Sequence, residues 1–519
     1  MRKHRARRII LGVTAITAVA IAGLAGCSLV DDLGGQSARP SVSVSPQSPP
    51  AGTQGLDRFY AQQLEWSECS GAECAQLTVP VDYAHPEGST IEISVLRVPA
   101  KKSSQRLGSL VVNPGGPGGS GVDYARAADF IVGPGVRDHY DVVGFDPRGV
   151  GRSAPIDCLS DAQLDTFLGS DPTPDDPAEE RTFAQGSADF AASCAKNAGP
   201  LLPHVSTEDA ARDMDVLRAA LGEQKLTYLG KSYGTFLGAT YADLFPTNVG
   251  RFVLDGVVAP DLTSEEINLG QAKGFELATR SWAKYCVTEG DCPLGDSVDS
   301  VMTNLRGFLA DVDATPLPKT GDGSVPKLTE GWASLGIAAA MYDQGAWRTL
   351  VDAMRDAVQG DGTALMQLAD QYADRNPNGG YAGNIMEVIY AVNCLDKPES
   401  DSVPEHEALA DAAAKQAPTW GRYLAWSSLV CGYWPVKPTG TPHEVTAEGA
   451  PPIVVIGTTR DPATPYEWSV RLHDQLAKAS LISFNGDGHT AYTRSNSCVD
   501  DAVDAWYLKG TLPKDGLRC

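Results

Sequence analysis

From about residue 90 onward, short apolar runs alternate with longer segments in which apolar residues recur every three or four positions. The short runs favour strands, and the longer segments favour amphipathic helices. The predicted strands are Ile91–Val98, Leu110–Val112, Val142–Phe145, Leu226–Leu229, Phe252–Leu254, Ile453–Ile456 and Leu481–Phe484, and the predicted helices between them include Ser206–Leu221 and Thr235–Leu244. This alternation favours an α/β fold with a mainly parallel sheet that is covered on both faces.

The strand pattern is interrupted between about residues 260 and 440. This region is predicted to be mostly helical, with helices over Glu265–Tyr285, Leu328–Met341, Trp347–Val358 and Ile385–Val392. Because the strand pattern resumes at Pro452, we interpret residues 261–439 as a large helical cap inserted before the last strands. The catalytic domain then comprises residues 56–260 and 440–519. A separate, unrelated domain is the alternative.

The N-terminus has the pattern of an export signal. A basic start is followed by an apolar stretch and by Leu24-Ala25-Gly26-Cys27. We interpret residues 1–26 as a lipoprotein signal peptide and Cys27 as the lipidated residue, which predicts a lipid anchor at the cell membrane and an extracytoplasmic location. A plain signal peptide and a transmembrane anchor are the alternatives. Residues 27–55 are rich in Ser, Pro and Gly and predict a flexible stalk.

The balance of charges is strongly acidic. Residues 1–26 contain five basic and no acidic side chains, so their removal lowers the formal net charge from −23 to −28. This excess argues against nucleic-acid partners and against binding to anionic lipid through charge. It would also suit cationic substrates, but a solvated acidic surface is the preferred interpretation. The sequence leaves the oligomeric state open.

Ten cysteines remain when Cys27 is set aside. Sequential pairing is the simplest of the many possible connectivities, and it predicts five local disulfides of the kind found in exported proteins. These pairs are Cys69–Cys74, Cys158–Cys194, Cys286–Cys292, Cys394–Cys431 and Cys498–Cys519. Zinc is the competing interpretation, but no pair has CxxC spacing and no histidine stands beside one at ligand spacing. We therefore expect neither a metal nor a cofactor.

A candidate nucleophile follows the predicted strand Leu226–Leu229. The segment Gly230-Lys231-Ser232-Tyr233-Gly234 has the G-x-S-x-G pattern and precedes a predicted helix. Between a strand and a helix, this pattern describes a tight turn that exposes the serine hydroxyl. A serine needs a base to accept its proton. Ser232 therefore predicts a histidine and an acid further along the chain.

Both residues follow the last two predicted strands. Asp461 comes after Ile453–Ile456, and His489 comes after Leu481–Phe484. The order serine, acid, histidine is that of α/β-hydrolases. In this interpretation His489 is the general base, and Asp461 orients it. Asp255, which also follows a strand, is the alternative acid.

A glycine-rich loop follows the predicted strand Leu110–Val112. Its glycines, in Asn113–Gly121, let backbone N–H groups approach a substrate oxygen. We predict an oxyanion hole from Gly115, Gly116 and the N–H of Tyr233. A phosphate-binding loop is the competing interpretation, but the Gly-Lys-Ser/Thr ending is absent from this loop.

Together, these motifs resemble α/β-hydrolase serine peptidases related to proline iminopeptidase. The chain is most similar to the exported tripeptidyl aminopeptidases of actinobacteria and to the carboxylesterase A-like lipoprotein serine hydrolases of the mycobacterial cell envelope. The resemblance rests on Asn113–Gly121, Phe145–Ser153, Gly230–Thr235, Thr459–Pro465 and Gly486–Thr490, and it extends from about residue 60 to the C-terminus. It implies an α/β-hydrolase fold whose cap narrows the site.

The resemblance also implies acidic side chains that bind the free ammonium group of a peptide. The candidates are Glu265 and Glu266 on the first cap helix and Asp396 in Cys394-Leu395-Asp396. Helix charges exposed to solvent or structural ion pairs are the alternative for all three residues. The predicted function is an aminopeptidase that releases short peptides such as tripeptides from N-termini and that also cleaves small esters. A carboxylesterase for acyl or envelope lipid esters, or an inactive binding lipoprotein, are the alternatives.

Overall fold

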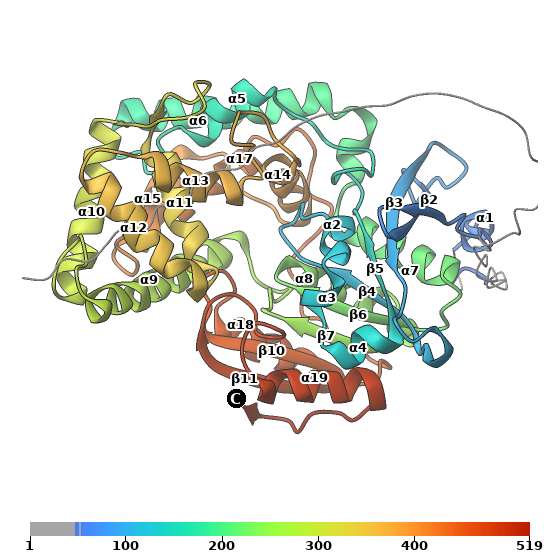
Figure 1. Cartoon of the computed structure of the whole chain (residues 1–519). Helices are drawn as coiled ribbons and strands as arrows, with labels where there is room; N and C mark the ends of the chain where they lie inside the picture. Colours follow the sequence, from blue (N-terminus) through green and yellow to red (C-terminus); the bar gives the residue numbers. More distant parts are fainter. Residues whose placement is uncertain (1–46, 51–52) are drawn as a thin grey trace, which may run out of the picture. The chain divides into compact units, whose positions relative to one another are not determined.

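One ten-stranded sheet organises residues 47–50 and 53–519, which the computed structural model describes (Figure 1). Its strand order is β1-β2-β3-β5-β4-β6-β7-β10-β11-β12. The strands are β1 (Ser67–Cys69), β2 (Ala72–Pro80), β3 (Thr90–Val98), β4 (Gly108–Asn113), β5 (Tyr140–Phe145), β6 (Leu226–Lys231), β7 (Val249–Asp255), β10 (Ile453–Arg460), β11 (Ala479–Asp487) and β12 (Leu517–Arg518). From β5 to β12 neighbouring strands are parallel, whereas β1, β2 and β3 form an antiparallel edge.

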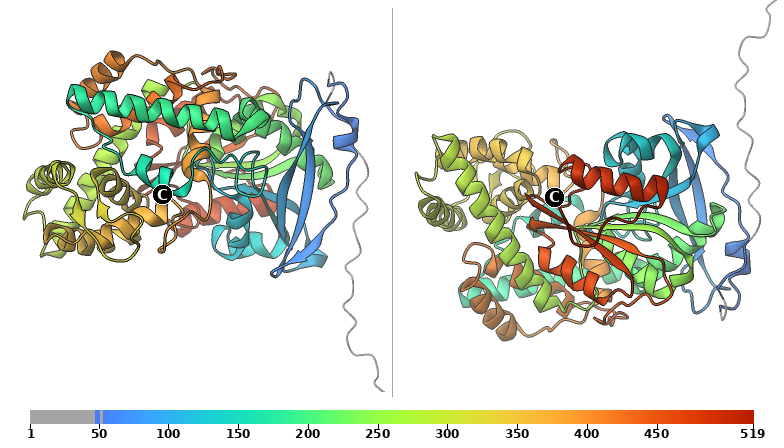
Figure 2. Two further views of the ribbon diagram at one scale, coloured as in Figure 1. Left: turned by 90° about the horizontal axis from the view of Figure 1, so that it is seen from above. Right: turned by 90° about the horizontal axis from the view of Figure 1, so that it is seen from below.

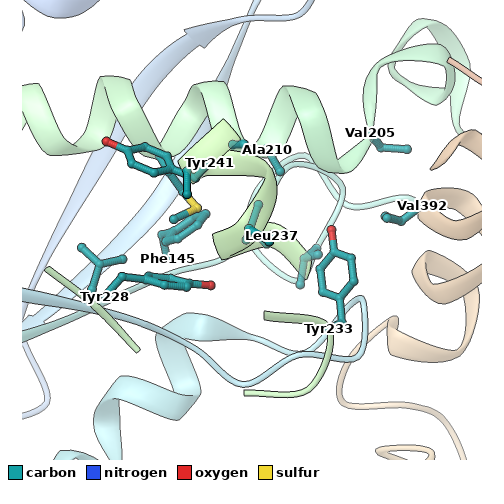
Figure 3. Close-up of a cluster of buried hydrophobic side chains, with 14 of the residues drawn as sticks. Phe145, Val205, Ala210, Tyr228, Tyr233, Leu237, Tyr241 and Val392 are labelled. Carbon is teal, nitrogen blue, oxygen red and sulfur yellow. The ribbon is translucent and has the colours of Figure 1, made fainter. Parts of the chain in front are cut away.

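Both faces of the sheet are buried, as the continuous apolar strands predict. In β4, Val111 joins one hydrophobic core, and its neighbours Leu110 and Val112 join the core on the opposite face. The first core packs α7 (Thr207–Ala220), α8 (Tyr233–Leu244) and α18 (Tyr466–Gln475) against the sheet, and Figure 3 shows its Phe145, Tyr228 and Tyr241. The second packs α2 (Gly121–Arg126), α3 (Ala128–Ile131), α4 (Pro134–His139) and α19 (Ser497–Lys509).

The chain leaves the sheet after β7 and returns to it at β10. Between them it forms nine α-helices, one short 3-10 helix (Gln344–Ala346) and one two-stranded sheet, of β8 (Leu317–Pro318) and β9 (Lys327–Leu328), all within the described residues. The helices are α9 (Ser264–Glu289), α10 (Val298–Ala314), α11 (Glu330–Met341), α12 (Trp347–Val358), α13 (Thr363–Tyr372), α14 (Ile385–Asp396), α15 (Val403–Ala414), α16 (Gly421–Ser427) and α17 (Leu429–Gly432). Their apolar faces form a core of their own, centred on α9 to α13. In Figures 1 and 2 these helices lie on the left of the view, and β2 and β3 lie on the right.

A second insertion completes the cap. Helices α5 (Asp161–Leu168) and α6 (Pro177–Asn197), between β5 and β6, pack against cap helices, and α6 also joins the first core through Phe190, Ala191 and Cys194. Leu164 belongs to the cap core, and the Phe183 ring lies 5.8 Å from Trp426. We assigned this segment to the catalytic domain because its helical pattern does not show which partner a helix packs against. The cap is therefore made of two chain segments.

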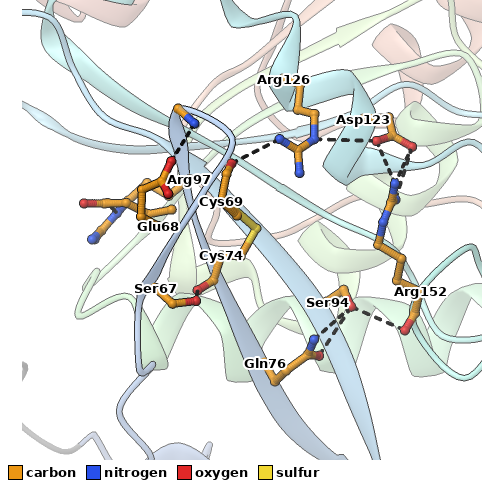
Figure 4. Close-up of a disulfide and its surroundings, with 12 residues drawn as sticks. Ser67, Glu68, Cys69, Cys74, Gln76, Ser94, Arg97, Asp123, Arg126 and Arg152 are labelled. Carbon is orange, nitrogen blue, oxygen red and sulfur yellow. Dashed lines mark hydrogen bonds and ion pairs between the residues drawn. A yellow bond between two sulfur atoms is a disulfide. The ribbon is translucent and has the colours of Figure 1, made fainter. Parts of the chain in front are cut away.

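The five disulfides join the cysteines that sequential pairing predicts. Cys69–Cys74 closes the β1–β2 hairpin at the edge of the sheet (Figure 4). Cys158–Cys194 ties α6 to the segment before α5, and Cys394–Cys431 joins α14 to α17 within the cap.

The predictions for residues 1–26 and Cys27 lie outside the described residues. Of the predicted stalk, Gln47 is described, and its amide contacts the body: its Nε2 donates to Glu223 O at 3.1 Å, and its Oε1 accepts from Arg218 at 2.6 Å. Within the described part of the chain, none of the helices has the length and apolar character needed to cross a membrane.

Candidate active site

Ser232 lies in a sharp turn between β6 and α8. Its backbone has φ 56° and ψ −129°, a conformation that is rare for residues other than glycine. Two contacts hold it there: its N–H donates to Asp255 O at 3.0 Å, and its carbonyl accepts from the Thr235 N–H at 2.8 Å. Strained backbone of this kind is concentrated at functional sites. The turn is the one that the G-x-S-x-G pattern predicts.

The two glycines of the turn are sterically required. A Cβ on Gly230 would lie 2.2 Å from Gly234 O, and a Cβ on Gly234 would lie 2.8 Å from Asn113 O. Both distances are far below van der Waals contact. A larger residue at Gly234 would push the turn away from β4, and one at Gly230 would force the turn itself open, so either would displace the serine.

Asp461 and His489 meet at the carboxyl ends of neighbouring strands, β10 and β11. His489 Nδ1 lies 2.9 Å from one carboxylate oxygen of Asp461 and 3.0 Å from the other. The same carboxylate accepts the N–H groups of Ala463 and Thr464 at 3.0 and 2.8 Å. Both side chains are buried. The acid is thus fixed by the backbone of its own loop and faces the imidazole.

The His489 ring lies beside the Ser232 turn. Its Cε1 is 3.3 Å from the position that a Cβ on Gly256 would take, and Gly256 follows Asp255, which accepts the Ser232 N–H. From the cap, Tyr342 accepts the His489 N–H through its carbonyl at 2.9 Å and packs its ring edge-on against the imidazole. Among the described residues, His489 Nε2 is buried without a hydrogen-bond partner. This nitrogen is therefore free to exchange a proton.

Asp255, the alternative acid, has a different role. Its buried carboxylate accepts the N–H groups of Ala491 and Tyr492, each at 2.9 Å. Lys231 Nζ lies 3.9 Å from it and donates to Tyr492 O at 2.7 Å. Burial raises the pKa of Asp255 and lowers the pKa of Lys231 to about 8. Asp255 holds the segment that follows His489 and makes no hydrogen bond to the ring.

The predicted oxyanion donors are not equivalent. Gly115 lies against the turn, because a Cβ there would be 2.8 Å from Ser232 Cβ, but its N–H donates to Asn113 Oδ1 at 2.9 Å. This bond takes up the Gly115 donor, which corrects that part of the prediction. No acceptor in the described chain receives the Gly116 N–H, and Tyr233, as the first residue of α8, has no intrahelical acceptor.

A cavity of about 270 Å³ opens from Ser232 into the cap. Gly116, Pro117 and Tyr233 line its catalytic end, and residues of α9, α11, α14 and α16 form much of the remaining wall. Most of its surface is apolar or aromatic, with amide groups from Asn268 and Gln271. A narrow, mostly apolar site with a few polar groups is typical of a pocket for a small substrate.

Glu265 and Glu266 do not face this cavity, contrary to the prediction. The cavity face of α9 consists of Ser264, Ile267, Asn268, Gln271 and Phe275, at helical spacing. The two glutamates lie on the exposed side. Glu266 accepts the N–H of Thr263 at 2.9 Å and pairs with Arg471 at 3.2 Å, so it caps the helix.

Asp396 is also absent from the cavity wall. It is buried, and its carboxylate accepts the N–H and hydroxyl of Thr207 at 2.8 and 2.5 Å, at the start of α7. Burial raises its pKa to about 6. The Thr207 hydroxyl in turn lies 2.6 Å from the hydroxyl of Tyr233, whose ring Figure 3 shows in the core. Asp396 therefore supports the residue after the nucleophile instead of meeting a substrate.

Sequence reasoning missed two residues of the site that the cap supplies. Tyr342 contacts His489, and Lys397 lines the cavity. Neither stands in a motif, and the spacing of apolar residues does not show what faces a cavity.

Comparisons with known proteins cover most of the chain. Residues 108–301 match the family described as "alpha/beta hydrolase fold", and residues 417–519 match "TAP-like protein". The chain is 36% identical to "Serine protease Hip1" of Mycobacterium tuberculosis over 100% of this chain and 99% of that one. It is 39% identical to "Carboxylesterase B" of the same species over 93% and 95%. It is 35% identical to "Tripeptidyl aminopeptidase" of Streptomyces lividans over 88% and 86%.

Proposed function

Since the chain belongs to the α/β-hydrolase family of these three proteins and is a serine hydrolase, we propose that it cleaves peptides or esters through an acyl-enzyme at Ser232. The observation that carries the proposal is the buried Asp461–His489 pair beside the strained serine turn, at the end of the cavity. Acids, bases and nucleophiles in this arrangement perform acyl transfer.

In the first half-reaction, His489 Nε2 accepts the proton of the Ser232 hydroxyl as Oγ attacks the substrate carbonyl carbon. Asp461 stabilises the imidazolium that forms, because its carboxylate is fixed against Nδ1. The N–H groups of Gly116 and Tyr233 face the developing oxyanion. His489 then donates the proton to the leaving amine or alcohol, and the acyl group stays on Ser232.

Water completes the cycle. His489 Nε2 accepts a proton from water as its oxygen attacks the acyl carbon, and the proton returns to Ser232 Oγ when the acid leaves. This chemistry treats amides and esters alike, so the cavity decides the substrate.

We favour short peptides as substrates and small esters as additional ones. Peptide groups find amide partners on the cavity wall at Asn268 and Gln271, and two of the relatives bear the names of a protease and a peptidase. The aminopeptidase form of the hypothesis has less support, since no carboxylate stands among the described lining residues to bind a free ammonium group. The apolar wall favours the second candidate, an ester hydrolase, like the relative named carboxylesterase.

Labelling with a fluorophosphonate probe tests the shared chemistry. The wild-type chain should be labelled and Ser232→Ala should not, whereas an unlabelled wild type would favour the inactive binding protein. The substrate follows from kcat/KM for a tripeptide anilide, its N-acetylated twin and 4-nitrophenyl butyrate. A strong preference for the free amine would support the aminopeptidase form, and equal rates on both peptides would exclude it.

We also propose that the chain is exported and anchored through a lipid on Cys27. The five disulfides support export, since such bonds form in oxidising compartments. Metabolic labelling with a palmitate analogue, followed by membrane fractionation, tests the anchor. Cys27→Ala should lose the label and leave the membrane fraction, and retention of both would contradict the proposal.

A further inference from the structure

One basic residue lines the cavity. Among the described residues that line it, Lys397 alone carries a basic or carboxylic side chain, and burial lowers the pKa of its amine. It follows the last residue of α14, and Asn393, one turn earlier on the same helix, lines the cavity as well. The wall thus combines an amine and an amide near the C-terminal end of α14.

The Lys397 ammonium has no hydrogen-bond partner within the described chain. The residue is 8% exposed, and its nearest aromatic neighbour is Phe236, whose ring centroid lies 4.6 Å from Nζ. Two carboxylates are close enough to influence it, but neither forms an ion pair with it. Asp396 is bonded to Thr207, and Asp261 is paired with Arg471 through Oδ2 at 2.7 Å, while Asp261 Oδ1 is buried without a hydrogen-bond partner among the described residues.

A buried cation without a partner is costly, because the interior replaces few of the hydrogen bonds that water supplies. Phe236 compensates one side of the ammonium through its ring face. The three ammonium protons still need acceptors, and the lining offers no carboxylate. A ligand in the cavity can supply them.

We propose that Lys397 binds a carboxylate group of the substrate, so that the enzyme selects acidic peptides or esters. This inference rests on the proposed acyl-enzyme chemistry at Ser232 and adds the substrate class. A single ammonium beside one amide suits a carboxylate, whose two oxygens can accept from Lys397 Nζ and from the Asn393 side chain. The ammonium then gains a partner only when an acidic substrate is bound.

Two matched pairs of esters test the proposal, one for each side of the scissile bond. The acyl pair is 4-nitrophenyl hydrogen glutarate and 4-nitrophenyl methyl glutarate. The leaving-group pair is 4-acetoxybenzoate and 4-acetoxybenzamide. For each pair, the ratio of kcat/KM for the charged over the neutral ester is compared between the wild type and Lys397→Met, so that intrinsic reactivity cancels.

We expect Lys397→Met to lower this ratio by about 10- to 100-fold in at least one pair, the range for losing a hydrogen bond to a charged group. Lys397→Glu should invert the preference in that pair and favour 4-nitrophenyl 5-aminopentanoate. Lys415→Met is the matched control, because Lys415 also follows the end of a cap helix but is exposed and does not line the cavity.

If Lys397→Met leaves the kcat/KM ratio unchanged in both pairs, the proposal is wrong. The role of Lys397 would then be to balance the charges of Asp396 and Asp261. Fluorophosphonate labelling of each variant separates this outcome from a failure of the acyl-enzyme mechanism. If the wild type is labelled and hydrolyses the neutral esters, the mechanism stands and the ratios decide the role of Lys397. If the wild type does neither, the proposed function itself fails.

Discussion

Buried ionisable side chains are hydrogen-bonded at the end of the site formed by the sheet, but not on the wall formed by the cap. At the sheet end, Asp255 and Asp461 each accept several backbone N–H groups, and each is fixed in one orientation. On the cap wall, the Lys397 amine is buried and has no hydrogen-bond partner among the described residues. A buried side chain with all its hydrogen bonds made is held in one position, whereas an unpaired one can still bond to a ligand. The contrast assigns the reaction to the sheet and the choice of substrate to the cap.

The largest expected effect is on the sheet side. Ser232→Ala and His489→Ala should each lower kcat by about 10⁴-fold or more, since each removes a participant in every step. Steady-state assays with 4-nitrophenyl butyrate measure this, and the melting temperature shows whether each variant folds. His443→Ala is the control, because His443 is exposed on the surface and pairs with Asp243. Residual activity above about 1% in Ser232→Ala would assign the chemistry elsewhere.

The second-largest effect should distinguish the roles of the two buried acids at the sheet, Asp461 and Asp255. Asp461→Asn should lower kcat by about 10²- to 10⁴-fold, because the amide cannot stabilise the imidazolium. Asp255→Asn should mainly destabilise the fold, by about 1 to 3 kcal/mol, since it weakens the acceptor of the Ala491 and Tyr492 N–H groups. Activity and urea denaturation on the same samples measure both effects. If Asp255→Asn lost more activity per folded molecule than Asp461→Asn, the acid assignment would be wrong.

The disulfides extend the comparison to stability. Cys394–Cys431 closes 37 residues next to Lys397, and Cys431 lines the cavity. Cys69–Cys74 closes 5 residues at the sheet edge. Loop entropy predicts about 4 kcal/mol for the first and about 2 kcal/mol for the second. Replacing the cap pair by alanines should therefore lower stability more, and it should also raise KM, whereas the sheet-edge pair should leave KM unchanged. A KM that responds equally to both replacements would contradict the division of roles.

The same division explains what the sequence could predict. The strands and the Ser232 turn follow from local rules, because apolar runs set buried strands and two glycines set one backbone conformation. The chain order of Asp461 and His489 then follows from the order of the last strands. In these cases the residues that form the recognisable sequence pattern are the same residues that build the strand or the turn.

The cap offers no such local signal. The helical spacing of α9 shows two faces but not which one meets a cavity, so Glu265 and Glu266 were placed in the site although they face solvent. The packing of α5 and α6 onto the cap depends on contacts far apart in the sequence, such as Phe183 against Trp426. Lys397 resembles any lysine at a helix end until tertiary contacts bury it.

The smallest expected effect concerns a carboxyl group that joins the two segments of the cap. Glu330, at the start of α11, accepts the hydroxyl of Thr173 from the α5–α6 connection at 3.1 Å. Burial and the neighbouring Asp171 raise the pKa of Glu330 from 4.5 to about 8. The fold therefore prefers the protonated acid, and the stability that this contributes is complete below about pH 4.5 and is lost as the pH rises through 8.

Glu330→Gln replaces the acid by a neutral acceptor of nearly the same shape. It should raise the melting temperature by a few degrees, on the order of 2 to 4 °C, at pH 9 and leave it unchanged at pH 5, where the native carboxyl is already neutral. Thermal unfolding at both pH values measures this, with the exposed Glu444→Gln as the control for the lost charge. Stabilisation of equal size at both pH values would reject the titration of Glu330 as its cause. Glu330 lies in the cap and does not line the cavity, so Glu330→Gln should leave kcat at pH 7 unchanged. A change in kcat at this pH would mean that the contact between the two cap segments also affects the active site.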